Sequence, residues 1–509
     1  MIHSFHCDKN SAIAKTADGL LRGFEFDGIY TFWGVRYAEA ARFEQPKPVA
    51  PWEGVRNALT RGYNAPLLNR PWVGDSEICM LHRYWPESEH CQYLNVWTPG
   101  LDDKKRPVLV WLHGGGFSTG SNMEMESYDG DRLAATQDCV VVGINHRLNL
   151  LGFLDLSAYG EKYHNSVNCG MADIVEALRW VQRNIAAFGG DPDRVTVFGQ
   201  SGGGSKVCAL QQIPEADGLF HGGIVQSGVL PRSFYSGADP KVSDYLIAEL
   251  QKQGYQPEEI QTVPVDTLFA AFHAIEPTLK EKGISANWGP VANDYYIGNA
   301  FDIGVRPHAA KIPMIIGSVY SEFAMQNIED ALASDEATQR AAVVARFGEE
   351  HADEILRLFK EAYPDHPIAE AAAVDHVFRM GTLDYLAVRA EQASAPTWGY
   401  MFAYSLPVDG GRPAWHCSDI PFVFAQVERT PFASEPGVSD RVEAEISGAW
   451  AAFARTGDPN HEGLTHWTPF SAPSRTCMVF DRKSHTRDGD FDRKLAEAAL
   501  AWAPAFKRR

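Results

Sequence analysis

The sequence lacks several features that mark large classes of protein. Its purely apolar runs, such as Val108 to Leu112 and Val140 to Val142, fall far short of the roughly 20 residues that a membrane-spanning helix needs. It has no interior basic run, and 46 Lys and Arg against 65 Asp and Glu give a formal charge of -19. Such a charge repels a phosphate backbone. We therefore expect a soluble protein without a membrane span and without nucleic-acid binding.

Metal and secretion signals are also missing. The eight cysteines are scattered without CxxC pairs or histidine clusters at zinc spacing, so no metal site is expected. The first dozen residues contain no apolar stretch followed by a small-residue cleavage site. We therefore expect a cytoplasmic chain in which the cysteines are mostly buried, reduced thiols.

Linkers, low-complexity tracts and internal repeats are absent as well. The composition, with 45% hydrophobic and 22% charged residues, is that of an ordinary globular protein. A length of 509 residues would suggest about three domains of roughly 150 residues each. Because no linker marks a boundary, we expect a single domain over residues 1–509.

Short apolar runs alternate with longer stretches of helical periodicity. The runs are Val108–Leu112, Val140–Ile144, Val195–Phe198 and Met314–Ile316. This alternation predicts an α/β fold, in which a large, mostly parallel central sheet carries helices on both faces. The clearest helix spans Met171–Ala187 and ends at the Gly-Gly-Asp-Pro of 189–192. Two further regions, about 241–282 and 330–392, have helical spacing and are interpreted as helical insertions around the sheet.

A serine in a glycine-rich turn follows the run Val195–Phe198. Gly199-Gln-Ser201-Gly-Gly203 is a G-x-S-x-G pattern between a predicted strand and a predicted helix. Small neighbours leave room for a strained central residue, which would expose the Ser201 hydroxyl at the carboxyl end of the sheet. The pattern alone also occurs as a passive turn, but the strand before it favours a nucleophile.

The same stretch is also compatible with a phosphate-binding P-loop. Gly199 and Gly204 have the right spacing, and Lys206 is close by. The lysine is one position late, however, and Val207 offers no hydroxyl to Mg²⁺. An NTPase is therefore disfavoured.

A second glycine run follows the apolar run Val108–Leu112. Three consecutive glycines, Gly114 to Gly116, stand between His113 and Phe117. Such a run lets backbone N–H groups turn toward a developing oxyanion, although it could also be only a loop. Together with the serine turn, it favours a catalytic site.

A serine nucleophile needs a histidine base and a carboxylate that orients it. Among 17 histidines, His416 is the best candidate because it opens directly onto the apolar run 420–424. Glu322 follows the run Met314–Ile316 by a few residues, where a loop carboxylate at the edge of the sheet belongs. The order Ser, Glu, His is that of the α/β-hydrolases. From the residues alone, Asp294 and Asp302 compete with Glu322 for the acid.

Motifs along nearly the whole chain resemble those of the type-B carboxylesterases, the family that includes cholinesterases, liver carboxylesterases and some fungal lipases. The matching segments are Phe32–Ala38, Ser88–Val96, His113–Phe117, Asn145–Leu148, Ala177–Ile185, Phe188–Pro192, Phe198–Gly204 and Phe453–Asn460. So many motifs in one order are highly specific. The resemblance implies an α/β-hydrolase fold.

The resemblance also implies a reaction and its residues. The family's acid falls on Glu322 and its base on His416, with Ser201 as the nucleophile. By similarity, the oxyanion hole consists of the N–H groups of Gly115, Gly116 and Gly202. The expected activity is hydrolysis of a small-molecule carboxylic ester through an acyl-enzyme, without a cofactor.

Several residues depart from the family pattern. Gln200 stands before the serine where glutamate is usual, and Lys206 occupies a position that is usually small or hydroxylic. Phe323 after the acid, and Trp415 and Cys417 around the base, replace smaller residues. We expect Phe323 and Trp415 to line the substrate site, unless both rings point into the core.

Two alternative functions remain open from the sequence. One is a cholinesterase-like binding module that has lost activity, which the retention of Ser201, Glu322 and His416 disfavours. The other keeps the chemistry but acts on amides, lactones or long-chain lipids. The pocket lies on distant loops, so one sequence does not distinguish these substrates.

Overall fold

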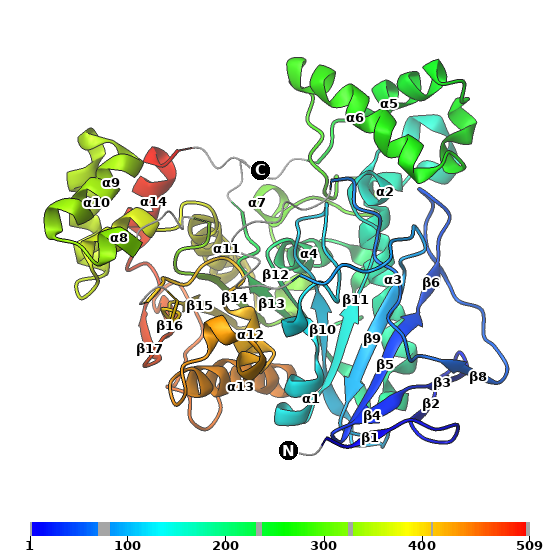
Figure 1. Cartoon of the computed structure of the whole chain (residues 1–509), viewed down its shortest axis with the longest axis horizontal. Helices are drawn as coiled ribbons and strands as arrows, with labels where there is room; N and C mark the ends of the chain where they lie inside the picture. The colour runs from blue at the N-terminus through cyan, green and yellow to red at the C-terminus, as the bar shows by residue number, and fades with distance from the viewer. Residues whose placement is uncertain (1–2, 70–81, 231–236, 324–328, 409–410, 505–509) are drawn as a thin grey trace.

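The structure is a computed structural model of the chain, and it describes residues 3–69, 82–230, 237–323, 329–408 and 411–504. Its main feature is a sheet of twelve described strands in the order β1-β4-β5-β9-β11-β10-β12-β13-β14-β15-β16-β17 (Figure 1). From β11 to β16 all neighbours are parallel, whereas β1 to β9 and β17 pair antiparallel. The predicted α/β fold with a large, mostly parallel central sheet is therefore confirmed.

The strands of this sheet have the following bounds: β1 Phe5–His6, β4 Phe24–Phe26, β5 Ile29–Arg36, β9 Tyr93–Thr98, β10 Arg106–Leu112, β11 Val140–Ile144, β12 Gly190–Gln200, β13 Gly222–Gln226, β14 Met314–Val319, β15 Thr397–Phe402, β16 Thr476–Phe480 and β17 His485–Asp488. Two small sheets contain β2 Ile13–Lys15, β3 Leu20–Arg22 and β8 Val55–Asn57, and β6 Ala38–Glu39 and β7 Lys47–Pro48. All four apolar runs of the sequence lie inside central strands.

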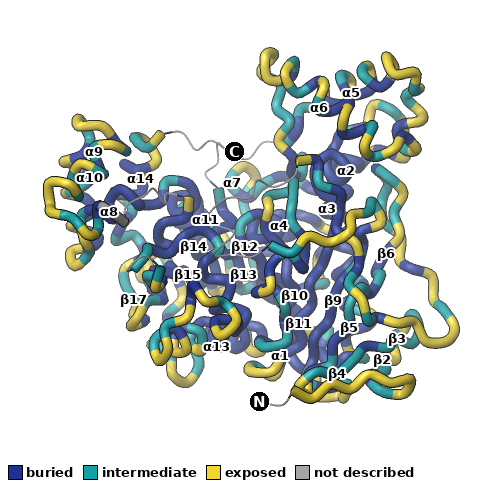
Figure 2. Tube along the Cα trace, in the orientation of Figure 1, coloured by how far each residue is buried: buried dark blue, intermediate teal, exposed yellow. Residues whose placement is uncertain are grey.

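Burial on both faces explains why these strands are continuously apolar. In β10, Val108 and Val110 belong to one hydrophobic cluster, while Leu109 and Trp111 belong to another. Successive side chains of a strand point to opposite faces, so a sheet covered on both sides needs apolar residues at every position. Figure 2 shows the central strands as buried throughout.

Helices cover the two faces of the sheet (Figure 1). Packed side chains place α3 Cys169–Asn184, α4 Gly202–Leu210 and α11 Phe378–Gln392 on one face, and α1 Asp131–Gln137 and α13 Ser439–Thr456 on the other. The predicted helix at 171–187 thus forms α3, but its last turn is a 3₁₀ segment, Ile185–Phe188, that ends at Gly189 with φ 74°. Glycine accepts this left-handed conformation without strain.

The first predicted helical insertion, at about 241–282, is present, whereas only the first part of the second region, about 330–392, forms an insertion, because α11 packs on the sheet. The first contains α5 Lys241–Lys252 and α6 Val265–Glu281, and the second contains α8 Glu329–Leu332, α9 Glu336–Phe347 and α10 Glu349–Ala362. The other α-helices in the described part of the chain are α2 Asn149–Phe153, α7 Ala300–Ile303, α12 Ile420–Val423 and α14 Arg493–Trp502. The insertions form separate lobes at the upper left and upper right of Figure 1.

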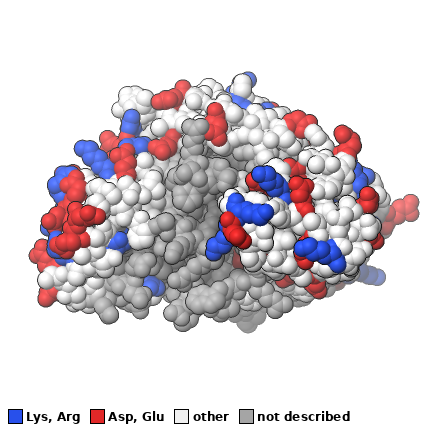
Figure 3. All heavy atoms as spheres, turned by 90° about the horizontal axis from the view of Figure 1, so that it is seen from above, with Lys and Arg blue, Asp and Glu red and all other residues white. Residues whose placement is uncertain are grey.

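Charges of both signs lie side by side on the face of the molecule drawn in Figure 3. Figure 3 shows Lys and Arg interspersed with Asp and Glu, and acidic side chains gather over the lobe of α9 and α10. This lobe presents exposed Glu349, Glu350 and Asp353. Within the described ranges, no helix combines the length and apolarity needed to cross a membrane.

The described cysteines are all free thiols. Cys91, Cys139, Cys169 and Cys477 are buried, Cys208 and Cys417 are half-buried, and Cys7 is exposed. Cys79 lies outside the described residues. Burial raises the pKa of the Cys139 thiol to about 12, so this thiol stays protonated and packs as a small apolar group.

Candidate active site

Ser201 lies at the sharp turn between β12 and α4. Its backbone has φ 58° and ψ -125°, a conformation that is strained for a residue with a side chain. Close packing of the turn explains the glycines around it. A Cβ at Gly199 would lie 2.5 Å from the carbonyl carbon of Gly203, and one at Gly203 would lie 2.9 Å from that of Leu112. The turn therefore places Ser201 at the carboxyl end of the sheet.

Glu322 and His416 form a hydrogen-bonded pair. Glu322 follows β14, and its Oε2 lies 2.5 Å from His416 Nδ1. The backbone joins the two loops as well, because His416 N donates to Glu322 O over 3.1 Å. The other carboxylate oxygen accepts the N–H of Val319 over 2.9 Å. These contacts place the proton of a neutral imidazole on Nδ1 and leave the lone pair on Nε2.

Burial controls the charge of this pair. His416 is 8% exposed and Glu322 is 1% exposed. Burial lowers the pKa of His416 below its ordinary value, and it raises the pKa of the Glu322 carboxyl. The imidazole is therefore held neutral, which is the form that accepts a proton.

The side-chain amide of Gln200 contacts the His416 imidazole, and the Cys417 thiol contacts that amide in turn. Gln200 Nε2 lies 3.2 Å from His416 Nε2 and 3.4 Å from Nδ1. Its other amide atom, Oε1, accepts the Cys417 thiol over 3.2 Å. Among the described residues, the His416 ring donates from Nδ1 to Glu322 and contacts the side-chain amide of Gln200, and no hydrogen bond joins it to Ser201 Oγ. In unliganded sites, catalytic hydrogen bonds often tighten only when substrate binds.

The glycine loop after β10 packs directly on the start of α4. Gly115 and Gly116 have φ 82° and 63°, which residues with a Cβ rarely adopt. A Cβ at Gly202 would lie 2.5 Å from the backbone nitrogen of Gly116. Ser201 is close too, since a Cβ at Gly114 would lie 3.5 Å from the serine Cβ. The structure thus brings Gly116 and Gly202 together beside Ser201.

The two aromatic residues expected near the site differ in their surroundings. Phe323 is 43% exposed, and its ring centroid lies 4.1 Å from that of His416. Trp415 is only 3% exposed and packs against Phe432 at 5.3 Å in the core. The structure therefore puts Phe323, and not Trp415, on the open side of the histidine.

Two neighbours of the histidine were not singled out by the sequence analysis. Phe378, the first residue of α11, stacks on the His416 ring at 5.1 Å and 13°. Asp419 is fully buried, and its Oδ2 accepts Gln226 Nε2 over 2.9 Å. Burial raises the pKa of Asp419 to about 6. Asp419 could have been noticed as a carboxylate three residues after His416, but no sequence signal marks Phe378.

The carboxylates that competed with Glu322 lie elsewhere. Asp294 pairs with the exposed His164 over 2.9 Å. Asp302 accepts the side-chain amide of Asn299 over 2.5 Å at the start of α7. No group of three or more His, Cys, Asp or Glu in the described ranges could hold a metal ion.

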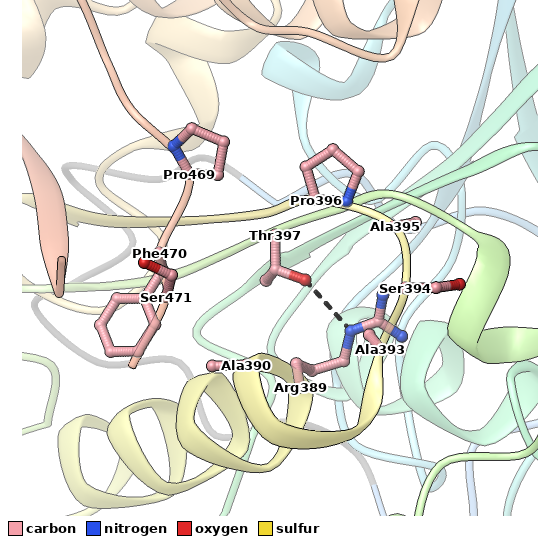
Figure 4. A pocket seen from close by; sticks show the side chains of 10 residues that line it. All are labelled: Arg389, Ala390, Ala393, Ser394, Ala395, Pro396, Thr397, Pro469, Phe470 and Ser471. Atoms are coloured by element: carbon pink, nitrogen blue, oxygen red, sulfur yellow. Dashed lines mark hydrogen bonds between the residues drawn. The ribbon is translucent and has the colours of Figure 1, made fainter. Parts of the chain in front are cut away.

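A pocket with a cavity volume of about 260 Å³ lies at the opposite edge of the sheet (Figure 4). It is lined by Arg389, Ala390, Ala393, Ser394, Ala395, Pro396, Thr397, Pro469, Phe470 and Ser471. Thr397 begins β15, whereas Gln200 ends the parallel strand β12, so the pocket is remote from Ser201. Arg389 donates to Thr397 Oγ1 over 3.2 Å and to two backbone carbonyls, which gives it a structural role.

The sheet, the serine turn after β12 and the Glu–His pair at the same edge define a hydrolase of the α/β class. The model described as "Carboxylesterase family" matches residues 10–498, and the chain belongs to this family. It is 30% identical over 478 residues to the para-nitrobenzyl esterase of Bacillus subtilis (strain 168), covering 92% of this chain and 94% of that protein. It is 34% identical over 487 residues to the phenmedipham hydrolase of Pseudarthrobacter oxydans, with the same coverage of 92% and 94%.

Solved structures agree with this assignment. An esterase from the anaerobe Clostridium hathewayi superposes with a TM-score of 0.93 at 40% identity, over 98% of this chain and 100% of that one. The protein is therefore a carboxylic-ester hydrolase, as its motifs implied.

Proposed function

We propose that this protein hydrolyses small-molecule carboxylic esters with Ser201 as nucleophile, His416 as general base and acid, and Glu322 as the orienting acid. The observation that carries the proposal is the 2.5 Å contact between His416 Nδ1 and Glu322 Oε2 at the edge of the sheet where Ser201 stands. A buried carboxylate on Nδ1 fixes the tautomer whose Nε2 accepts the serine proton.

The reaction runs in two halves. Ser201 Oγ attacks the ester carbonyl carbon while its proton passes to His416 Nε2, and the tetrahedral intermediate collapses as that proton moves to the leaving alcohol. Water then loses a proton to the same Nε2 and attacks the acyl-enzyme. The carboxylic acid leaves, and Ser201 regains its proton.

The negative oxygen of each intermediate is assigned to the N–H groups of Gly115, Gly116 and Gly202. Support comes from the close approach of Gly116 to Gly202 and from the positive φ angles of the loop. Fixed N–H groups stabilise charge that develops in the transition state without reorganising.

We also propose that the chain forms one catalytic domain. The strands of the large sheet come from residues 5 to 488, so residues far apart in sequence complete the same layer. A cut in the middle of the chain would separate hydrogen-bonded strands.

The proposal is tested with p-nitrophenyl esters of increasing chain length, together with the matching amides. We expect ester hydrolysis to dominate and to be lost after a sulfonyl fluoride reacts with Ser201. The Clostridium hathewayi esterase is described as able to hydrolyse aliphatic aromatic polyesters. Such a polyester is therefore a useful second substrate. Full activity in a completely labelled enzyme would contradict the assignment of Ser201.

The acid limb of the pH profile is predicted to lie below the ~6.5 of free imidazole. Only neutral His416 accepts the serine proton, so kcat/KM is lost as pH falls through its pKa, and burial lowers that pKa. The carboxyl groups that act on the charge of the ring are Glu322, which is bonded to Nδ1, and the buried Asp419 and Asp375. In Gln200→Glu a further carboxylate would contact the ring, which should raise the limb by roughly one pH unit or more.

Gln200→Met is the matched control, because it removes the amide and adds no charge. Its limb should stay close to that of the wild type. The measurement is kcat/KM for one p-nitrophenyl ester from pH 4.5 to pH 9, with folding checked at each end. A limb in Gln200→Glu that is unchanged or lowered would show that position 200 does not influence the charge of His416.

Phe323 is predicted to restrict the size of the ester. Its half-exposed ring lies against His416, so it takes up volume beside the reacting carbonyl. Phe323→Ala should raise kcat/KM for a branched or aryl ester relative to an acetate, by on the order of tenfold.

Trp415→Phe is the control for Phe323→Ala, since Trp415 precedes His416 but packs in the core. It should lower the melting temperature and leave the ratio between bulky and small esters unchanged. The ratio of kcat/KM for the bulky ester to kcat/KM for the acetate is measured in both variants with the same two substrates. An unchanged ratio in folded Phe323→Ala would remove Phe323 from the substrate site.

A further inference from the structure

Lys206 is a buried cation next to the glycine loop. It lies on α4, five residues after Ser201, and is fully buried. Its Nζ donates a hydrogen bond to His113 O over 2.9 Å and lies 5.6 Å from the ring centroid of Phe117. No ion pair found within the described ranges involves Lys206. A buried ammonium without a bonded carboxylate is costly, and such groups concentrate at functional sites.

The groups around Lys206 leave its charge largely uncompensated. His113 and His146 stack at 5.0 Å, and each donates from Nδ1 toward a backbone carbonyl. Burial and the nearby Lys206 lower the pKa of both histidines well below the ordinary value, so both are neutral. Glu124 is the carboxylate whose charge acts on Lys206 in the attractive direction.

The bonded carbonyl connects Lys206 to the oxyanion loop. His113 O belongs to the peptide that leads into Gly114, and a Cβ at Gly203 would lie 3.0 Å from the same oxygen. The ammonium is thus fixed behind the loop that carries the N–H groups of Gly115 and Gly116. In a site with little water, a fixed positive charge acts strongly on nearby negative charge.

We propose that Lys206 is a positioning and electrostatic residue of the oxyanion hole, which holds the His113 carbonyl in place and stabilises the negative oxygen of the tetrahedral intermediate by its charge. This inference rests on the proposed function of Ser201. Lys206 acts through the loop and through its charge, and does not touch the substrate.

The proposal predicts a fall in rate at alkaline pH. Burial lowers the pKa of Lys206 to about 7, so the charged form is lost as pH rises above neutrality. A neutral amine still donates to His113 O, but it no longer stabilises the oxyanion. The kcat/KM profile should therefore be bell-shaped, with an acid limb from His416 and an alkaline limb from Lys206.

The decisive variants are Lys206→Met and Lys206→Arg. In Lys206→Met we expect kcat to fall about tenfold with little change in KM, because the lost interaction belongs to the transition state. Its alkaline limb should be absent. Lys206→Arg keeps a charge at all accessible pH values, so it should restore much of kcat and also lack the alkaline limb.

Stability separates this role from a merely structural one. Lys206→Met removes a buried charge, so its melting temperature should rise, most clearly below pH 7 where the wild-type lysine is charged. Cys208→Ala, on the same helix, is the control and should leave the pH profile unchanged. A structural role alone would lower the melting temperature without removing the alkaline limb.

Each measurement also has a result that would overturn the inference. The inference is wrong if kcat/KM of the wild type stays constant into the alkaline range. It is also wrong if kcat/KM of Lys206→Met still falls at alkaline pH. If the variants do not fold, the wild type still tests the idea through a trifluoromethyl ketone, whose anionic adduct should bind more weakly above pH 7. Constant affinity would reject the role of Lys206. Sulfonyl fluoride labelling of Ser201 is scored in parallel, so failure of the proposed nucleophile is recognised separately.

Discussion

Replacing Ser201 by alanine should abolish ester hydrolysis while the protein remains folded. Loss of a triad serine typically lowers kcat on the order of 10⁶-fold, because no other group can form the acyl-enzyme. Alanine is nearly the same size and keeps the Ser201 backbone bond to Gln226 O, which spans 2.8 Å. The measurement is p-nitrophenyl butyrate hydrolysis, with intact mass after exposure to a sulfonyl fluoride. We expect neither turnover nor a mass increase.

Ser205→Ala provides a matched control on the same helix. Ser205 Oγ donates to Gly228 O over 2.7 Å, so its hydroxyl is engaged in structure and is not available as a nucleophile. This variant should still hydrolyse the ester and should still gain the mass of one label. If Ser201→Ala retained near wild-type activity, the nucleophile would have to be sought elsewhere.

Glu322→Gln should produce the second largest loss, about 10⁴-fold in kcat, with the fold retained. The amide is isosteric and its oxygen can still accept the N–H of Val319. Its NH₂ group, however, would donate to His416 Nδ1 and force the ring proton onto Nε2. The base would then have no lone pair facing Ser201. The measurement is kcat, together with the rate of covalent labelling of the serine.

The controls for this variant are Asp294→Asn and Asp302→Asn. Both carboxylates compete with Glu322 for the role of acid when only the sequence is known, yet they contact His164 and Asn299 instead of His416. Both variants should retain near wild-type kcat. A Glu322→Gln enzyme that kept more than a tenth of the activity would place the orienting acid at another residue.

Local pattern accounts for the parts of the fold that the sequence predicted well. The run Val140–Ile144 coincides with β11, and the run at 108–112 lies within β10. Each run is continuously apolar because its strand is buried on both faces of the sheet, and the order of residues in a short segment is enough to show this. The predicted helix end at Ala187 differs from the end of α3 at Asn184, because the last turn tightens into the 3₁₀ segment Ile185–Phe188. Such fraying depends on packing and not on propensity.

The order of motifs was enough to indicate the family, which the comparisons confirm. It also named the candidate residues Ser201, Glu322 and His416, since these follow recognisable segments. It left Phe323 and Trp415 equivalent, although one ring is 43% exposed and the other 3%. The direction of a side chain in a loop is set by what packs around it. Two aromatic residues that each neighbour a candidate residue in sequence are therefore distinguished only by the tertiary structure.

What the sequence determined by itself is the alternation of strands and helices and the glycine-framed serine turn, because each depends on residues close together in the chain. It also determined the class of reaction, because the order of motifs along the chain is typical of one family. Only the tertiary structure decided which groups surround His416, the proposed base. Phe378 arrives from α11 and Gln200 from β12, while Lys206 comes to lie behind the loop of His113. These contacts join segments far apart in sequence, and they exist only once the sheet has brought the ends of its parallel strands to one edge.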